Sequence, residues 1–207
     1  MLQCNLGRGY AATHELKQYI VNKGYDIVFI TEPYVGKNNT LSQINGYSLY
    51  QHSKHGSRVK ACIAIKNNFG SCLGINQCCT TNLCTVQLSL KDSKLLLICA
   101  YVEPDVDEEN TLNHLEQILK TSDTTRRIIC GDFNGWHTTW GSNKINKRGK
   151  EIMDLIMANE LNICNTGSHP TFETTTHGQL RTSIVDLTLA SDNIVSNVRS
   201  SRYRLYF

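Results

Sequence analysis

The sequence predicts an α+β fold in which helices cover the outside of packed β-sheets. Three observations predict it. Short apolar runs alternate with helical patterns, four strand-like runs follow one another between residues 46 and 101, and no repeat, low-complexity segment or linker interrupts the 207 residues. A chain of this length, with 40% hydrophobic and 19% charged residues, can stabilise its own core. We therefore expect one domain over residues 1–207.

The first elements are a strand, a helix and a second strand. Residues 1–5 read as a strand, and they lack the charged and apolar segments of a secretion signal. Ala12, Leu16 and Ile20 then share one helical face, and Gly24 is typical of a helix end. The apolar run 26–30 follows as a buried strand.

The middle of the chain is a succession of strands. Short turns such as Asn67-Asn68 separate these runs, so neighbouring strands are expected to pair antiparallel. The predicted strands are 46–50, 61–66, 83–90 and 94–101.

The last part of the chain returns to alternating helices and strands. We predict a helix on Leu112, Leu115 and Leu119, a strand at 127–130, a helix on Ile152, Leu155 and Ile156, and a late strand at 183–190. The strand at 127–130 runs directly into Gly131-Asp132-Phe133-Asn134.

Nine cysteines and a mild positive charge narrow the class of protein. The cysteine number is odd, and Cys62, Cys99, Cys130 and Cys164 sit in apolar runs where a thiol packs as a small hydrophobe. The cluster from residue 72 to 84 lacks the paired spacing of a structural zinc site. We expect reduced thiols and a nuclear or cytoplasmic location. The net charge of +3 permits a nucleic-acid partner, and no apolar run has the ~18 residues of a membrane span.

Polar side chains stand at the ends of apolar strands. Asn5 follows the first strand, Glu32 the second, and Asp132 and Asn134 the strand at 127–130, while Asp186 lies inside the late strand. A carboxylate there is costly to bury unless a cation or donor pairs with it. Hard oxygen ligands suit magnesium or calcium, and such a site suggests phosphate chemistry. The alternative is that each residue is a strand-end cap or a surface residue.

These residues lie in motifs that resemble one protein superfamily. The elements LQCNLGR, TEPY, AYVEP, GDFNGWHTTWGS, RGK and SIVDLTLAS occur in order from residue 2 to about 192. Together they resemble the endonuclease/exonuclease/phosphatase superfamily. Within it they resemble the apurinic-endonuclease-like domain of non-LTR retrotransposons of the jockey-like and related arthropod types.

The resemblance implies a fold, a reaction and partners. The fold is a four-layer sandwich of two packed mixed β-sheets flanked by helices. The reaction is nicking of double-stranded DNA with magnesium, or alternatively manganese, as the cofactor. A reverse transcriptase domain is expected in the parent polyprotein, and no membrane is involved.

The resemblance also assigns roles to individual residues. It places Glu32 and Asn5 at the metal and gives catalytic roles to Tyr101, Asp132, Asn134 and Asp186. Tyr101 contacts the phosphate region, Asp132 orients or activates the attacking water, and Asn134 contacts the scissile phosphate. These residue types suit phosphodiester hydrolysis, because an amide can donate to a phosphate and a carboxylate can accept from water.

Two further groups of residues lie beyond GDFN. His137 and Trp140 are expected to support the Asp132 loop by packing or hydrogen bonding. A basic loop then carries Lys144, Lys147, Arg148 and Lys150, which either contact DNA phosphates or form a solvated face. We see no aromatic interleaving that would suggest stacking of single-stranded bases.

The sequence departs from the family pattern near residue 190. The family's last motif is Ser-Asp-His, with a catalytic histidine, whereas Ser191-Asp192 is followed here by Asn193 and residues 191–207 contain no histidine. We expect a domain incomplete at its C-terminus, lacking the final strand, in a fragment or decayed copy with weak or no nicking. Alternatively, His137 or His177 replaces the missing group.

Two other functions compete with the nuclease. A catalytically dead DNA-binding protein, or an inert retroelement relic, would fit the missing Ser-Asp-His. A phosphatase of the same superfamily would act on phosphoinositide or sphingolipid phosphate esters, but GWHTTWGS and RGK argue against it.

Overall fold

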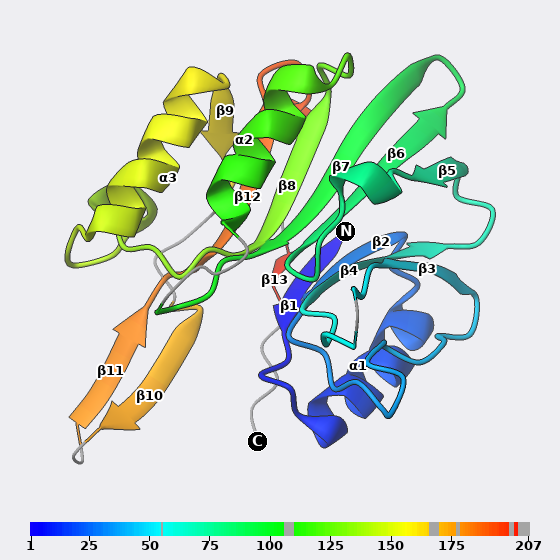
Figure 1. The fold of residues 1–207 in the computed structure, drawn as a ribbon, viewed down its shortest axis with the longest axis horizontal. Coiled ribbons are helices and arrows are strands. Elements are labelled where there is room, and N and C mark those ends of the chain that lie inside the picture. The colour runs from blue at the N-terminus through cyan, green and yellow to red at the C-terminus, as the bar shows by residue number, and fades with distance from the viewer. Residues whose placement is uncertain (55, 106–109, 166–169, 177–178, 199–200, 203–207) are drawn as a thin grey trace.

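Two β-sheets pack face to face in this computed structural model, with helices on their outer faces (Figure 1). The structure describes residues 1–54, 56–105, 110–165, 170–176, 179–198 and 201–202. One sheet runs in spatial order β13 (Ser201–Arg202), β1 (Leu2–Asn5), β2 (Ile27–Thr31), β4 (Ala61–Lys66) and β3 (Tyr47–Gln51). Strands β13, β1 and β2 are parallel to one another, and β4 is antiparallel to both of its neighbours.

The second sheet has six strands. Its spatial order is β5 (Ser71–Gly74), β6 (Leu83–Leu90), β7 (Ser93–Tyr101), β8 (Arg127–Asp132), β12 (Asp186–Ser191) and β9 (Leu161–Ile163). Only the β7–β8 pair of this sheet is parallel. Strands β10 (Phe172–Thr176) and β11 (Gln179–Ser183) form a separate antiparallel hairpin that projects from the body of the molecule (Figure 1).

Alternation along the strands separates three apolar layers. Val28 and Ile30 of β2 pack with helix α1 (Tyr10–Lys23), whereas Phe29 points into the core between the sheets. Leu97 of β7 joins Phe29, and the neighbouring Ile98 packs under α2 (Thr111–Thr121) and α3 (Lys147–Ala158). This period of two is what a strand buried on both faces requires. The resulting order of helix, sheet, sheet and helices confirms the four-layer sandwich.

Most predicted elements are confirmed, and the late strand is corrected. The helices form on the expected faces, and the strands at 27–31, 47–51, 61–66, 83–90, 93–101 and 127–132 match the predicted runs. The predicted strand at 183–190 is wrong at its start, because Ser183 ends β11 and β12 begins at Asp186. Ile184 and Val185 connect the two strands and are buried, so apolarity alone could not reveal the break.

The remaining differences are short elements without an apolar pattern. Strands β5, β9, β10, β11 and β13 were not predicted. Cys62, Cys99 and Cys130 are buried free thiols as expected, and Cys164 is half-buried.

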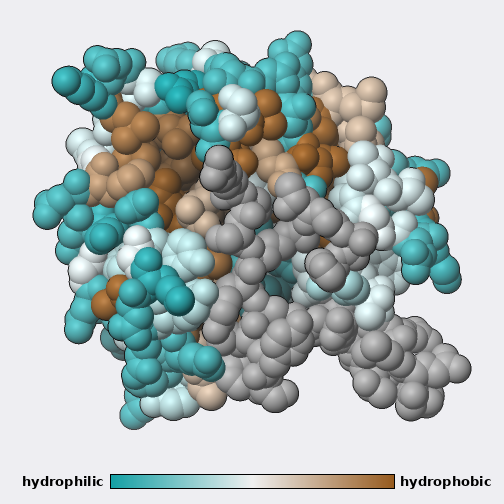
Figure 2. Space-filling model, turned by 180° about the vertical axis from the view of Figure 1, so that it is seen from behind, coloured by the Kyte–Doolittle hydropathy of each residue, from teal (hydrophilic) through white to brown (hydrophobic). Residues whose placement is uncertain are grey.

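The surface is uneven in polarity. Seen from behind, hydrophobic residues gather on the upper part of the molecule, and the lower left part, on the α1 side, is largely hydrophilic (Figure 2). Within the described ranges, no helix combines the length and apolarity needed to cross a membrane.

Candidate active site

The two sheets meet at a hydrogen bond between polar strand ends. Asn5 closes β1 of the five-stranded sheet, and Asp132 closes β8 of the six-stranded sheet. The Asn5 Nδ2 donates to Asp132 Oδ2 at 2.7 Å, and the Asn5 Oδ1 accepts from the backbone N–H of Gly7 at 2.8 Å. Two residues that are 127 positions apart in the chain are therefore held together.

Glu32 faces a cation that the sequence reasoning did not assign. Its Oε1 lies 2.8 Å from the guanidinium of Arg8, and its side chain is 16% exposed. The backbone of Glu32 is left-handed, with φ +47°, and its N–H donates to the Lys60 carbonyl at 2.8 Å. The Arg8 N–H donates in turn to the Glu32 carbonyl at 2.7 Å. Backbone bonds thus aim the Glu32 carboxylate in an uncommon conformation, of a kind that clusters at functional sites.

Tyr101 links this ion pair to the six-stranded sheet. It ends β7 directly beside Asp132, is buried, and forms a side-chain hydrogen bond with Glu32. Burial first, and then the charges of Glu32 and Asp132, raise the pKa of the Tyr101 phenol well above its ordinary value. Tyr101 therefore stays a neutral hydrogen-bond donor across the physiological pH range.

Asp132 and Asp186 form a buried pair of carboxylates. The antiparallel register of β8 and β12 places them opposite each other, and both are almost fully buried. Burial, followed by the charge of Asp186, raises the pKa of Asp132, although hydrogen bonds from Asn134 and Asn5 oppose the shift. The site thus concentrates negative charge that a cation would relieve.

Gly131 allows β8 to approach β7 closely at this point. A Cβ at Gly131 would lie 1.8 Å from the carbonyl oxygen of Ala100, which no side chain could occupy. The first residue of the GDFN motif must therefore be glycine because of the close backbone contact with β7, and not because it takes part in the reaction.

Asn134 is fixed from both sides. Its backbone has φ +46°, its N–H donates to Asp132 Oδ1 at 3.0 Å, and its Nδ2 donates to the Val102 carbonyl at 2.9 Å. One Nδ2 hydrogen is thereby used, and the second is left to donate to another acceptor. The amide is held in a defined position beside the Asp132 carboxylate.

Gln3 is a site residue that the sequence reasoning missed. Its buried Nε2 donates to the Gly131 carbonyl at 2.9 Å and to Asp186 Oδ1 at 3.3 Å. Its Oε1 accepts from the Thr188 hydroxyl at 3.1 Å. Gln3 thus extends from the five-stranded sheet to hold the position of Asp186. The signal that could have found it is a polar residue inside an apolar strand, which is costly to bury without a partner.

His137 and Trp140 lie in the loop beyond Asn134. The His137 Nδ1 accepts from the Thr139 N–H at 3.2 Å, and the rings of His137 and Trp140 lie 5.1 Å apart. Trp140 is buried and donates from Nε1 to the Gly135 carbonyl at 3.2 Å. These contacts are internal to the loop and favour a supporting role. His177, the other candidate for a replacement histidine, lies outside the described residues.

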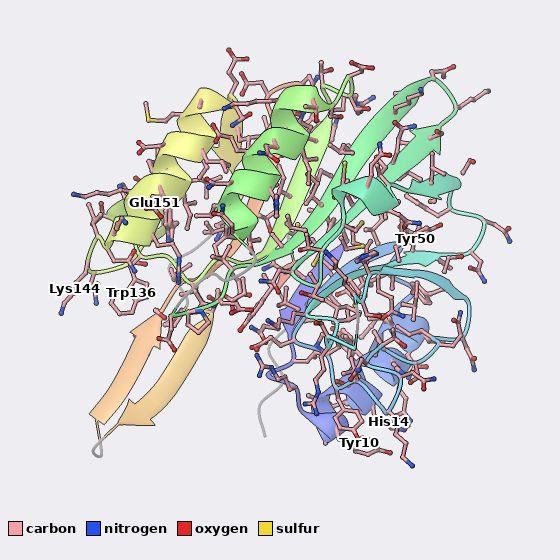
Figure 3. The ribbon with its side chains drawn as sticks, in the orientation of Figure 1. Tyr10, His14, Tyr50, Trp136, Lys144 and Glu151 are labelled. Atoms are coloured by element: carbon pink, nitrogen blue, oxygen red, sulfur yellow. The ribbon has the colours of Figure 1, made fainter. Side chains whose placement is uncertain are left out.

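The expected basic loop is wrong in part, because only Lys144 precedes α3, whereas Lys147, Arg148 and Lys150 lie in its first turn. These cations are of two kinds. Lys144, Lys147 and Lys150 are exposed, and Figure 3 shows Lys144 and Trp136 on the α3 side of the molecule. Arg148 is half-buried, and its guanidinium donates to the carbonyls of Pro104 at 2.7 Å, Asp105 at 3.2 Å and Asn134 at 3.4 Å. Arg148 therefore anchors the loops of the site, which favours a positioning role over phosphate contact.

The donor set of the site is one of hard oxygen atoms. Glu32, Asp132 and Asp186 supply carboxylates. The charges of Asp186 and Glu32 both contribute to raising the pKa of Asp132. Across the part of the chain that the structure describes, no three His, Cys, Asp or Glu side chains are grouped so as to hold one metal ion. The three carboxylates thus do not converge as direct ligands of one ion; Glu32 is bound by Arg8 and Asp132 by Asn5.

A family model and a relative both match this chain. The family model described as endonuclease-reverse transcriptase matches residues 95–206. An RNA-directed DNA polymerase from the mobile element jockey of Drosophila funebris is 23% identical over 165 residues, which is 77% of this chain. The chain spans 17% of the length of that relative.

Solved structures show the same fold. The endonuclease domain of TRAS1, a telomere-specific non-LTR retrotransposon, is 29% identical with a TM-score of 0.83, covering 94% of this chain and 86% of that domain. The AP endonuclease LMAP from Leishmania major is 12% identical with a TM-score of 0.68, covering 94% of this chain and 79% of that enzyme. At that identity, the second match supports the fold alone.

Proposed function

Because this chain belongs to the endonuclease-reverse transcriptase family, we propose that it is a metal-dependent endonuclease that nicks double-stranded DNA. In this proposal it acts as the endonuclease domain of a non-LTR retrotransposon, joined to a reverse transcriptase in the parent polyprotein. The observation that carries the proposal is the Asn5–Asp132 hydrogen bond between the two sheets, beside Glu32, Tyr101 and Asp186.

The residues of this chain fit the demands of phosphodiester hydrolysis. Asp132 accepts a proton from the attacking water, and the hydrogen bonds from Asn5 and the Asn134 N–H hold its carboxylate in place for this role. Asn134 donates its second Nδ2 hydrogen to the scissile phosphate without adding negative charge. Tyr101, kept neutral by its raised pKa, donates its O–H to Glu32, and it would contact the phosphate region by exchanging that hydrogen bond for one to the phosphate.

A divalent cation fits the chemistry of the donor set. We propose that Glu32, with Asn5 beside it, holds Mg²⁺, with Mn²⁺ as the alternative ion, because both prefer oxygen ligands. The bound ion would polarise the phosphate and offset the charge that develops on the leaving oxygen. Burial, followed by the charge of Asp186, raises the pKa of Asp132, and a bound cation would favour the charged form of this carboxylate. Arg8 holds Glu32 in the orientation described above.

A supercoiled-plasmid nicking assay tests the function. Wild-type protein is expected to convert supercoiled to open-circular DNA with Mg²⁺ and not with EDTA. Asp132→Asn should lower the rate by about 10²- to 10⁴-fold, the usual effect of losing a general base. Asp92→Asn, at an exposed turn, is the matched control and should keep the wild-type rate. Equal rates for Asp132→Asn and the wild type would overturn the proposal.

We also propose that the domain over residues 1–207 nicks DNA weakly. Residues 191–207 contain no Ser-Asp-His triplet, and that motif carries the family's catalytic histidine. Appending a strand with Ser-Asp-His should raise the nicking rate. The proposed impairment would be contradicted if the 207-residue chain nicks plasmid rapidly, if this nicking depends on Asp132, and if appending the strand does not raise the rate. DNA binding without any cleavage would instead favour the inactive DNA-binding alternative.

A further inference from the structure

An exposed group of aromatic rings lies beside the candidate active site. Tyr10 opens α1 and is 67% exposed, and Tyr34 follows β2 and is 44% exposed. Their ring centroids are 5.1 Å apart at 90°, and His14 is stacked on Tyr10 at 6.3 Å. We call these three residues the aromatic ledge. Figure 3 shows Tyr10 and His14 together at the N-terminal part of α1.

Hydrogen bonds connect the two segments that carry the ledge. The N–H of Tyr34 donates to the Thr13 hydroxyl at 2.9 Å, and that buried hydroxyl donates to the Gly9 carbonyl at 2.8 Å. The segment after Glu32 is thereby tied to α1. Large exposed rings fixed in place offer a preorganised face, which lowers the entropic cost of binding a flat partner.

Two cavities with cationic walls adjoin the ledge. The first has a volume of about 360 Å³ and is lined by the ledge together with Lys17 and Lys37. The second, of about 550 Å³, lies on the other side of Tyr34 and is lined by Arg8, Lys37, Arg58 and Lys60. Of the described residues that line either cavity, none is an aspartate or glutamate. Arg8 is ion-paired with Glu32 and Lys60 with Glu103, so the cationic character of the walls rests mainly on Lys17, Lys37 and Arg58.

The second cavity shares Arg8 with the candidate active site. Arg8 lines it and at the same time bonds Glu32 at 2.8 Å. A polyanion lying in the active site could therefore extend along Arg8 and past Tyr34 toward Lys37 and Lys17. The charge of these walls complements phosphate groups, and the rings complement the π-faces of bases.

We propose that the aromatic ledge binds an unpaired nucleotide of the DNA strand that leaves the active site. The base stacks on Tyr34 or Tyr10, and Lys17 and Lys37 meet the flanking phosphates. An unpaired nucleotide is favoured over duplex DNA because a base exposes its face to an aromatic ring only when it lies outside the helical stack. The inference rests on the proposed nuclease function, which it extends to a preference for DNA with a single-stranded flank.

The sequence alone does not reveal the ledge. The sequence shows no aromatic interleaving, because Tyr10 and Tyr34 are separated by a helix and a strand. Only the pairing of β1 with β2 brings the two rings together.

Fluorescence anisotropy in EDTA tests the proposal without cleavage. A blunt duplex is compared with the same duplex carrying a single-stranded tail of about five nucleotides, within the usual range for one binding site, placed in turn on each end of one strand. Wild-type protein should bind one tailed duplex more tightly than the blunt one. Tyr34→Ala should lose about 5- to 100-fold in affinity for the tailed duplex, the usual range for one stacked base. Tyr34→Trp should keep the preference.

Two controls separate stacking from damage to the fold or to charge. Phe69→Ala removes an exposed ring outside the ledge and both cavities, and should leave both affinities unchanged. Lys37→Ala should lower the dependence of log affinity on log salt by about 0.7 for each single-strand phosphate that the lysine no longer neutralises. Thermal unfolding verifies that the Tyr34 variants are folded.

The outcomes distinguish this inference from the nuclease proposal. Equal affinities of the wild type for tailed and blunt DNA would refute nucleotide binding by the ledge. So would a folded Tyr34→Ala variant that loses the same factor in affinity for both DNAs. If the wild type nicks plasmid and shows no tail preference, only the ledge fails. A tail preference without any nicking would retain the ledge and refute the nuclease.

Discussion

Replacing Gln3 by methionine should weaken the junction between the two sheets. The change keeps an unbranched side chain of similar size and removes its polar end. Three buried groups are left without this partner: the Gly131 carbonyl, the Asp186 carboxylate and the Thr188 hydroxyl. Each neutral bond is worth about 1 kcal/mol and the charged one about 1.5–3 kcal/mol, so the loss in unfolding free energy should be about 3–5 kcal/mol. That is a large part of the ~5–15 kcal/mol typical of a domain.

Urea unfolding followed by tryptophan fluorescence measures this loss. Gln18→Met, on the exposed face of α1, is the matched control and should stay within about 0.5 kcal/mol of the wild type. Thr188→Val made in the Gln3→Met background should cost about 1 kcal/mol less than in the wild type, because its hydroxyl no longer has Gln3 to bond. A Gln3→Met loss below about 1 kcal/mol, or strictly additive effects of the two changes, would refute the reasoning.

Three further predictions concern backbone contact, thiol chemistry and loop anchoring. Gly131→Ala should lower the unfolding free energy by more than about 3 kcal/mol, because its Cβ would clash with a β7 carbonyl; thermal unfolding measures this. A hydrogen bond from Cys84 lowers the pKa of Cys79 to about 7, so the alkylation rate of Cys79 by iodoacetamide should rise through pH 7. Burial raises the pKa of Cys78, so Cys78 should react only at higher pH. Peptide mass spectrometry measures the alkylation of both residues. Arg148→Ala should slow plasmid nicking by about 10- to 100-fold with little change in DNA affinity, since the arginine orders site loops.

Each of these predictions has a control. Gly36→Ala places its Cβ in open space and should leave stability nearly unchanged. Cys84→Ala, which removes the donor, should move the alkylation midpoint of Cys79 to higher pH, and an unmoved midpoint would contradict the assigned cause. Lys147→Ala removes a cation that is 93% exposed in the same loop, so equal nicking by this variant and Arg148→Ala would contradict the anchoring role.

Elements with one consistent buried face were predictable from the sequence. Helix α1 and strand β2 carry their pattern in consecutive residues, because burial repeats with a period of about 3.6 or 2. Strand β5 alternates between exposed and half-buried positions, and so it carries no apolar signal. The break before β12 was hidden for the opposite reason, since Ile184 and Val185 are buried although they belong to no strand.

The site was predictable in its residue types and not in its contacts. Asn5 and Asp132 stand out as polar groups at the ends of apolar strands, and the structure joins them. The partner of Glu32 could not be inferred, because Arg8 reaches it only when β1 pairs with β2. Gln3 stands out as a polar residue in an apolar strand, but its bond to Asp186 depends on how the two sheets dock. Arg148 was expected either to contact DNA phosphates or to lie on a solvated face, because a sequence does not show that backbone carbonyls lie within its reach.

The division of the site between two sheets also has a consequence for synthesis on the ribosome. Asn5 and Glu32 emerge early, whereas Asp186 pairs with Asp132 only after most of the chain has been made. Contacts that span 127 and 183 residues form late in folding, because the intervening loop must be closed first. A nascent chain that has not yet released β12 therefore lacks the Asp132–Asp186 pair. Cutting competence would arise in one late, cooperative step, after the two sheets have docked.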